Sequence, residues 1–424
     1  MKPPVKPSVQ ATGLAAEALR DAPFGESAMS LEPGLAEREM VINFGPQHPA
    51  MHGTLRLLLR LDGEYVRSCE PEIGYLHTGF EKLGEHRTFN QFVVVTDRMN
   101  YLSAMANNIG YACAVEELLG IELPPRAMAI RVIMAEMSRI SDHILSVGLQ
   151  GMDLGAFTAL LWAFIEREKV YDVFELTSGG RLTTSYTRVG GLAFDFPEEC
   201  EGRIRRFLDS LEAVLQEIEG MLSNNRIFID RSKGVAHLSR EQAIAYGVTG
   251  PVARASGVDR DLRRDRPYLG YEQYDFEVPL QTAGDVYARY LVRLAEVRQS
   301  MRIVRQALDT LPAGPYNALG KTTLPDKDDT YTKMESLIQH FMLEMPGHGI
   351  KTPHGQVYHA TESPNGELGW FIVSDGTGVP YRVRVRPPSV YLFQSIVPQI
   401  ENRLVSDVVA TMSSLNVIAG ELDR

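Results

Sequence analysis

The chain has 424 residues, 44% of them hydrophobic, so it can bury a sizeable core and fold as two or three packed subdomains. Its 43 Lys and Arg residues against 54 Asp and Glu residues give a net charge of -11, which argues against nucleic acid or an anionic membrane surface as the main partner. No run approaches the roughly 18 apolar residues of a transmembrane helix, so we expect any membrane association to run through protein partners.

The three cysteines, Cys69, Cys113 and Cys200, predict neither disulfides nor a metal centre on this chain. No two of them have C-x-x-C spacing, which excludes an iron–sulfur cluster ligated by this chain alone and fits a reducing compartment. The first residues lack the basic start and apolar core of a signal peptide, so we expect a cytoplasmic protein.

The first part of the chain divides into two regions. Residues 1–38 are rich in Pro, Ala, Gly and Glu without a sustained period, and we expect a mobile N-terminal extension. Residues 39–96 are predicted to form an N-terminal α/β region. Within it, leucines alternate with arginines over residues 54–61, and Asp62-Gly63 supplies a turn into residues 64–68, which predicts a β-hairpin.

Just before this hairpin, residues 45–53 read G-P-Q-H-P-A-M-H-G and hold His48 and His52, two of the ten histidines. Pro46 and Pro49 favour extended geometry, so we expect a turn with no helix. A histidine on a turn is well suited to donate protons near neutral pH. Two other interpretations stay open, namely loop histidines that bond nearby carbonyls and a two-histidine metal site that lacks a third ligand nearby.

Residues 97–311 show the apolar period of amphipathic helices and predict a helical bundle. The expected helices cover residues 97–120, 124–148, a stretch from about 151, 198–222 and 285–311. Residues 312–424 predict a polar connector, a short helix near 333–342, a small sheet of segments 357–360, 368–374 and 381–385, and terminal helices. The fold class is thus α+β and mainly α. No G-x-G-x-x-G occurs, so the chain has no dinucleotide fingerprint.

The histidine turn, followed by G-Y-L-H-T-G-F-E-K at residues 74–82, resembles the quinone-site D subunit of the proton-pumping NADH:quinone oxidoreductase, respiratory complex I, and the likeness extends from about residue 40 to the last residue. This resemblance implies a hydrogenase large-subunit-like fold and a quinone site formed with the B subunit. It also implies activity only within the complex, and partners that include the B, C and membrane-arm H subunits. The location would be peripheral, on the cytoplasmic side of the bacterial inner membrane.

The resemblance also implies site residues. His52 and Tyr101 match the pair that holds the quinone headgroup, with Asp153 beside the histidine, while His48 and Arg98 would border the quinone pocket or the partner's cluster. From the residues alone, Tyr101 could equally be an ordinary aromatic at a helix start, and Asp153 an N-cap of the following helix.

The same family resembles the large subunit of nickel–iron hydrogenases, whose metals need thiolates in R-x-C-x-x-C and D-P-C-x-x-C motifs. Here the matching segments, residues 98–103 and 416–421, read R-M-N-Y-L-S and N-V-I-A-G-E, with no thiol. Soft thiolate ligands are essential to such a site, so hydrogen chemistry is excluded and we expect no metal site on this chain. The family places its quinone in the vacated cavity.

The family further implies that a buried Arg98 lies beside a [4Fe-4S] cluster on the B subunit and raises its potential. Many relatives carry a histidine, held to couple that potential to pH, where this chain has Thr183. Two alternatives stay open. One is a sister complex fed by ferredoxin or another carrier, because the nucleotide and flavin sites would be on other subunits. The other is a non-catalytic scaffold, against which the joint presence of His52, Tyr101 and Asp153 argues.

Overall fold

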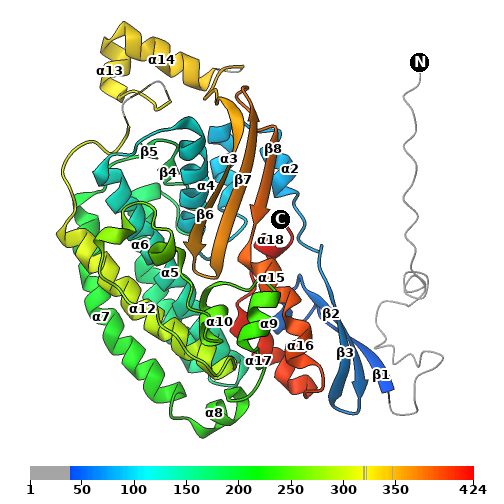
Figure 1. Cartoon of the computed structure of the whole chain (residues 1–424). Helices are drawn as coiled ribbons and strands as arrows, with labels where there is room; N and C mark the ends of the chain where they lie inside the picture. The colour runs from blue at the N-terminus through cyan, green and yellow to red at the C-terminus, as the bar shows by residue number, and fades with distance from the viewer. Residues whose placement is uncertain (1–38, 319, 321, 346) are drawn as a thin grey trace, which may run out of the picture.

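The computed structural model describes residues 39–424 except residues 319, 321 and 346, so the expected mobile extension, 1–38, lies outside the described residues. The predicted α+β, mainly α class is confirmed (Figure 1). Three small antiparallel sheets accompany a bundle of long helices, and the two three-stranded sheets come from the beginning and the end of the described chain.

The N-terminal sheet has the strand order β1-β2-β3, with β1 (Glu39–Phe44), β2 (Arg56–Asp62) and β3 (Tyr65–Glu72). The predicted hairpin is confirmed as β2 and β3, and its alternating leucines are buried on one face. Strand β1 was not predicted, because its half-buried residues show no clear alternation of apolar and polar side chains. The sheet's apolar face packs against helices from the end of the chain.

The bundle is built from α4 (Ala104–Leu119), α5 (Pro125–Asp153), α6 (Phe157–Ser178), α7 (Glu198–Leu222) and α12 (Val286–Asp309). Helix α5 is its centre, because it packs against both α6 and α12 and is buried along most of its length (Figure 1). Gly148 allows α6 to approach closely: a Cβ atom there would lie 2.9 Å from the Cβ of Ala163.

The first bundle helix was predicted to begin at Asp97, and this boundary is wrong. Helix α3 (Phe89–Thr96) ends one residue earlier, and α4 begins only at Ala104. Between them, the side-chain oxygen of Asn100 accepts hydrogen bonds from the backbone N–H groups of Leu102 and Ser103, both 3.2 Å long. An asparagine that bonds the backbone in this way favours a turn over a continuous helix.

Short elements connect these helices and surround them. They are α2 (Phe80–Gly84), β4 (Thr187–Arg188), β5 (Gly191–Leu192), α8 (Arg226–Ser232), α9 (Arg240–Ala245), α10 (Gly250–Ala255), α11 (Leu262–Asp265) and η2 (Tyr271–Gln273). Strands β4 and β5 form a two-stranded sheet of their own beside α4.

The C-terminal region begins with a projecting pair of helices, α13 (Lys327–Thr332) and α14 (Met334–Glu344), at the top of Figure 1. The predicted sheet is confirmed and packs on α4 with the order β6-β7-β8. Its strands are β6 (His354–Ser363), β7 (Gly366–Asp375) and β8 (Arg382–Arg386). The chain closes with α15 (Pro388–Gln394), α16 (Ile396–Ile400), α17 (Val405–Leu415) and α18 (Ala419–Leu422).

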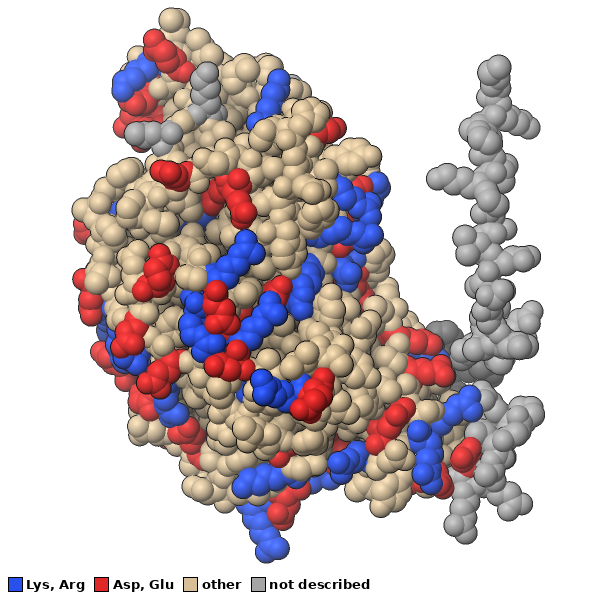
Figure 2. All heavy atoms as spheres, in the orientation of Figure 1, with Lys and Arg blue, Asp and Glu red and all other residues tan. Residues whose placement is uncertain are grey.

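Acidic and basic side chains are interspersed over the face of the molecule that Figure 2 shows, without a broad field of one sign. Many of them form ion pairs along or between helices, such as Arg298 on α12 with Glu219 on α7 at 2.8 Å.

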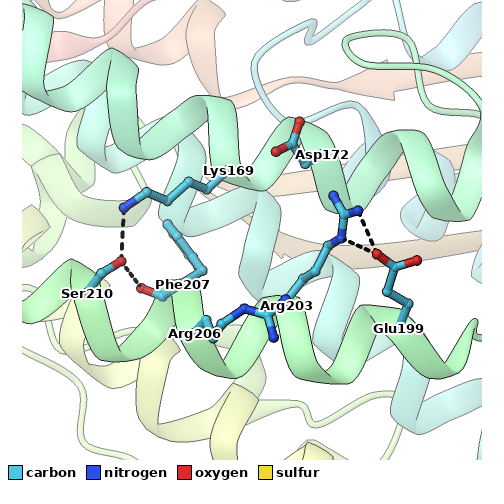
Figure 3. Close-up of a pocket in the computed structure, with 7 residues that line it drawn as sticks. All are labelled: Lys169, Asp172, Glu199, Arg203, Arg206, Phe207 and Ser210. Atoms are coloured by element: carbon cyan, nitrogen blue, oxygen red, sulfur yellow. Dashed lines mark hydrogen bonds and ion pairs between the residues drawn. The ribbon is translucent and has the colours of Figure 1, made fainter.

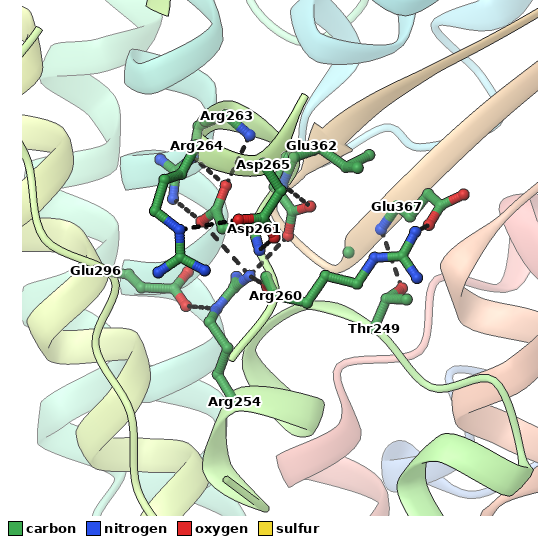
Figure 4. Close-up of polar contacts among 12 residues, drawn as sticks. Thr249, Arg254, Arg260, Asp261, Arg263, Arg264, Asp265, Glu296, Glu362 and Glu367 are labelled. Atoms are coloured by element: carbon green, nitrogen blue, oxygen red, sulfur yellow. Dashed lines mark hydrogen bonds and ion pairs between the residues drawn. The ribbon is translucent and has the colours of Figure 1, made fainter. Parts of the chain in front are cut away.

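Beneath this surface lies a buried ion network, which we define by Glu136, Arg254, Asp261, Arg263, Glu296 and Glu362. Figure 4 labels all of these residues except Glu136. Arg254 bonds Glu296 at 2.7 Å and Glu362 at 2.8 Å. Arg263 bonds Asp261 at 2.6 Å and Glu136 at 3.1 Å. The six residues come from α5, α10, α11, α12, β6 and the loop before α11, so the network joins the bundle to the C-terminal sheet.

We predict that Glu296→Ala destabilises the purified chain by about 3–5 kcal/mol, because it leaves the buried guanidinium of Arg254 without its closest partner. Urea unfolding measures this loss. The control is Glu217→Ala on α7, which removes an exposed carboxylate and should change the free energy of unfolding by less than about 0.5 kcal/mol. A loss for Glu296→Ala as small as the control's would contradict the role given to the network.

Candidate functional site

The histidine turn holds His48 and His52 at the two ends of a single 3-10 turn, η1 (Pro49–Met51). We expected no helix here, and that expectation is wrong for these three residues. Pro49 is at the first position of the turn, where its missing N–H and fixed φ are no obstacle. His48 caps the turn, because its Nδ1 accepts a hydrogen bond from the N–H of Ala50 at 3.2 Å.

His52 ends the same turn in the left-handed region, with φ of 53°. His52 is exposed as a whole residue, but neighbouring protein atoms displace part of the water around its ring. This desolvation lowers the pKa of His52. A neutral imidazole at neutral pH is the result. Such a ring can take up a proton and pass it on, which is the property expected of a proton-handling residue.

Tyr101 lies on the turn between α3 and α4 that Asn100 shapes, and its side chain is half-buried. Burial raises the pKa of Tyr101, and the nearby carboxyl groups of Asp142 and Glu421 raise it further. The phenol is therefore protonated at physiological pH and able to donate a hydrogen bond.

Asp153 is the last residue of α5, and α6 begins only at Phe157. The alternative interpretation of Asp153 as the N-cap of the following helix is therefore wrong, since Ala156 takes that position and no side chain caps α6. Burial raises the pKa of Asp153 to about 6, although a hydrogen bond with Ser413 on α17 opposes the shift. The carboxyl can thus change its protonation state close to neutral pH.

Helix α17 lies beside the elements that carry two of the predicted residues, His52 and Asp153. It contacts η1, which separates the two histidines, and it contacts α5, whose last residue is Asp153. Within the described part of the chain, no hydrogen bond joins His52, Tyr101 and Asp153 directly to one another. His52 and Asp153 thus both lie beside α17, Tyr101 lies on the turn before α4 near Asp142 and Glu421, and the three do not form a preformed triad.

Arg98 differs from the expectation of a buried guanidinium, because in this chain its side chain is exposed. Its Nη1 donates to the carbonyl of Val94, one turn earlier on α3, at 2.8 Å. The exposed guanidinium lies on the same turn as Tyr101. Thr183 is exposed as well.

Sequence reasoning missed three buried acids around the Tyr101 turn, Asp97, Asp142 and Glu421. Burial raises the pKa of Asp97 to about 6, although it accepts hydrogen bonds from Ser185 and Asn108. One signal was available: Asp142 follows Ile140 by two residues on a helix buried on all sides, where an acid needs a reason to be present.

Two hollows of the surface are lined by other residues than the three predicted ones. One, of about 390 Å³, lies between α6 and α7 and is lined mainly by charged side chains from both helices (Figure 3). Another, of about 370 Å³, is lined by residues of the 74–82 segment and by the last residues of the chain. There, Asp423 accepts from the backbone N–H groups of Gly74 and Leu76 at 2.9 and 2.7 Å.

Three further properties bear on function. The described residues contain no cluster of three or more His, Cys, Asp or Glu side chains arranged to hold a metal ion. Burial raises the pKa of the Cys69 and Cys113 thiols to about 12, so these sulfurs stay protonated. Among the helices described, none has an apolar stretch long enough to cross a membrane.

Comparison with known proteins decides the family. The family described as respiratory-chain NADH dehydrogenase, 49-kDa subunit, matches residues 153–424. The D subunit of the NADH-quinone oxidoreductase of Akkermansia muciniphila is 51% identical over 387 residues, which cover 91% of this chain and 93% of that protein. The chain belongs to this family. It is a subunit of an NADH:quinone oxidoreductase, and the resemblance seen at the histidine turn is confirmed.

Two other relatives extend the comparison. The D subunit of Geotalea uraniireducens is 48% identical over 386 residues, covering 91% of this chain and 98% of that protein. The C/D subunit of the NADH-quinone oxidoreductase of Bdellovibrio bacteriovorus is 48% identical over 399 residues, which cover 93% of this chain but 71% of that protein. Catalysis by a member of this family belongs to the assembled oxidoreductase.

We predict that Asp153→Asn stabilises the purified chain in a way that depends on pH. Between pH 4 and 6 the unfolded chain releases the Asp153 proton while the folded chain keeps it, so ionisation favours unfolding. The advantage of the variant in thermal unfolding should therefore grow from about pH 4 to pH 6 and stay constant above pH 7. An advantage that does not change with pH would contradict a raised pKa for Asp153.

Proposed function

We propose that this chain forms the quinone-reduction site of its NADH:quinone oxidoreductase, with His52, Tyr101 and Asp153 as the residues that handle protons. The observation that carries the proposal is that all three side chains have a shifted pKa, with His52 and Asp153 beside α17 and Tyr101 on the turn before α4. His48 borders the same turn as His52 and would help to hold the headgroup.

Reduction of a quinone to a quinol takes up two electrons and two protons, so its two carbonyl oxygens need a donor each. The protonated phenol of Tyr101 would hydrogen-bond one oxygen and give up its proton as the electrons arrive. His52 would serve the other oxygen, with Asp153 as the neighbouring acid that titrates near neutral pH. Because these groups do not form a preformed triad in this chain, bound quinone would complete the arrangement.

The electrons would come from outside this chain. Its described residues offer no thiolate set for a cluster, and its buried cysteines stay protonated. We therefore assign the [4Fe-4S] cluster to the partner B subunit, facing the exposed Arg98. A guanidinium covered by that partner would stabilise the reduced cluster and raise its potential. Since Thr183 cannot titrate, we expect no histidine-linked pH dependence of the potential at that position.

Other parts of the surface support docking in a larger assembly. Phe157, Leu161, Phe164 and Ile165 are exposed along one face of α6, directly after Asp153. An exposed apolar stripe beside the proposed site suits the B subunit or the membrane-arm H subunit. The combined C/D protein among the relatives supports the C subunit as a third partner. The complex would then lie with this chain on the cytoplasmic side of the inner membrane and couple reduction to proton pumping.

We predict that His52→Ala or Tyr101→Phe lowers NADH:quinone reductase activity about 100-fold or more, the usual loss when a positioned acid is removed. The measurement is made in membranes that contain the assembled complex, with NADH oxidation by an artificial acceptor as the control for assembly. Loss of both activities in His52→Ala would mean that the histidine turn is structural. Unchanged quinone reduction in both variants would refute the site.

We also predict that Arg98→Met lowers the midpoint potential of the partner's cluster, because a positive charge favours the reduced, more negative state. Redox titration followed by electron paramagnetic resonance measures it in the assembled complex. Arg98→Lys keeps the charge and should restore most of the potential. A potential that is equal in all three forms would place Arg98 away from the cluster.

A further inference from the structure

The region behind Tyr101 contains a close approach between two distant parts of the chain. Helix α18 begins against the backbone of the Tyr101 turn. A Cβ atom at Gly420 would lie 2.8 Å from the carbonyl oxygen of Arg98 and 3.0 Å from that of Met99, so glycine suits the contact. The next residue, Glu421, is therefore directly at the turn, and its carboxyl interacts with the Tyr101 phenol.

Glu421 is fully buried, and only one of its two carboxyl oxygens accepts a hydrogen bond. Its Oε2 accepts from the Ser389 hydroxyl at 2.8 Å, while its Oε1 has no partner among the described residues. A buried carboxylate needs several donors or a bonded cation to stay ionised. The surroundings of Glu421 thus favour the neutral, protonated acid.

The cations near Glu421 are bonded elsewhere. Arg386 donates to the carbonyls of Glu367 and Gly247 at 2.8 and 2.9 Å, and Arg424 bonds Glu81 at 3.2 Å. Both guanidiniums lower the pKa of Glu421, but neither forms a hydrogen bond with it. Their charge is therefore shared with other groups and offsets only part of the cost of burial.

A second acid faces Glu421 from α5. Asp142 is fully buried, accepts a hydrogen bond from Asn416 at 2.6 Å through Oδ1, and has no partner for Oδ2 among the described residues. Burial raises the pKa of Asp142, while His143, Arg167 and Arg293 around it act in the opposite direction. Two acids this close do not both ionise readily, so the pair retains a proton.

Two polar side chains that flank Tyr101 in the sequence also lack a partner. The Nδ2 of Asn100 and the Oγ of Ser103 are buried without a hydrogen bond in the described part of the protein. Buried polar atoms normally find a partner, often an internal water. We expect such water beside the turn to carry a proton between the Glu421 carboxyl and the Tyr101 phenol, which interact electrostatically.

We propose that Glu421, with Asp142 beside it, is the internal proton donor that restores the Tyr101 phenol after quinone reduction. This inference rests on the proposed role of Tyr101. When a quinone oxygen takes the Tyr101 proton and the electrons from NADH oxidation, a phenolate remains. Glu421 transfers its proton to that phenolate, becomes a carboxylate, and is later reprotonated from solvent. Glu421 acts through Tyr101 and does not touch the quinone.

The proposal has a pH signature. Burial, assisted by Asp142, raises the pKa of Glu421 to about 8, and the Ser389 hydrogen bond lowers it. Glu421 therefore holds its proton at neutral pH and loses it as the pH rises through 8. Quinone reduction should then decline on the alkaline side of its pH profile with a midpoint near pH 8.

The first test is Glu421→Gln in the assembled complex, since glutamine keeps the shape but cannot carry the proton. We expect quinone reduction to fall about 10-fold at pH 7, with an unchanged KM for quinone, and the alkaline decline near pH 8 to disappear. Glu421→Asp keeps a titratable group and should restore much of the rate. Glu217→Gln, at an exposed site on α7, is the matched control and should behave as the unsubstituted complex. A normal rate and pH profile in Glu421→Gln would overturn the relay.

A second variant keeps the carboxyl and tests the same idea if Glu421→Gln fails to assemble. Ser389→Ala removes the hydrogen bond that lowers the pKa of Glu421, so the alkaline decline should move to higher pH. A decline that does not move would refute the relay. Normal activity in both Tyr101→Phe and His52→Ala refutes the proposed site itself, whereas impaired Tyr101→Phe with normal Glu421→Gln and Ser389→Ala refutes the relay alone.

Discussion

The buried ion network centred on Arg254 and Arg263 is the constraint on which the arrangement of the molecule depends (Figure 4). Charges this deeply buried are tolerable only when every partner is in place, so the network fixes α5 against α12 and both against strand β6. Once α5 is fixed, its two ends are fixed as well. One end meets the short strands beside α4, and the other carries Asp153 to α17.

The buried acids of this fold form two groups whose pKa values are shifted in opposite directions. In the network, burial alone would raise the pKa of Glu296, but Arg254 and His143 hold it below its usual value, and this acid stays ionised. Asp97 and Glu421 beside the Tyr101 turn, and Asp153 at the end of α5, have no bonded cation among the described residues, and burial raises their pKa values to between about 6 and about 8. Compensated charge therefore stabilises the core, while uncompensated acids that can exchange protons gather where quinone chemistry is proposed.

Much of the fold could be predicted because the periodic patterns are strong and local. Helix α7 occupies the predicted residues 198–222. The alternation of leucines along β2 predicted the hairpin correctly. Errors arose where side chains compete with the backbone or where a single residue decides the local structure. Asn100 ends the helix expected from Asp97, and Pro49 begins a 3-10 turn in a segment whose prolines had argued against any helix. The exposure of Arg98 could not be predicted either, since burial depends on what packs against a residue.

The sequence by itself determined most of the secondary structure of the bundle and the family, because apolar period and motifs are properties of neighbouring residues. Through the resemblance to that family it also proposed His52, Tyr101 and Asp153 as site residues. Only the tertiary structure decided which acids meet those residues. Asp142 and Glu421 are separated by most of the chain, and they come together because α18 packs against the Tyr101 turn through Gly420. Proton affinity inside a protein depends on burial and on the charges nearby, and both are set by contacts between residues that are distant in the sequence.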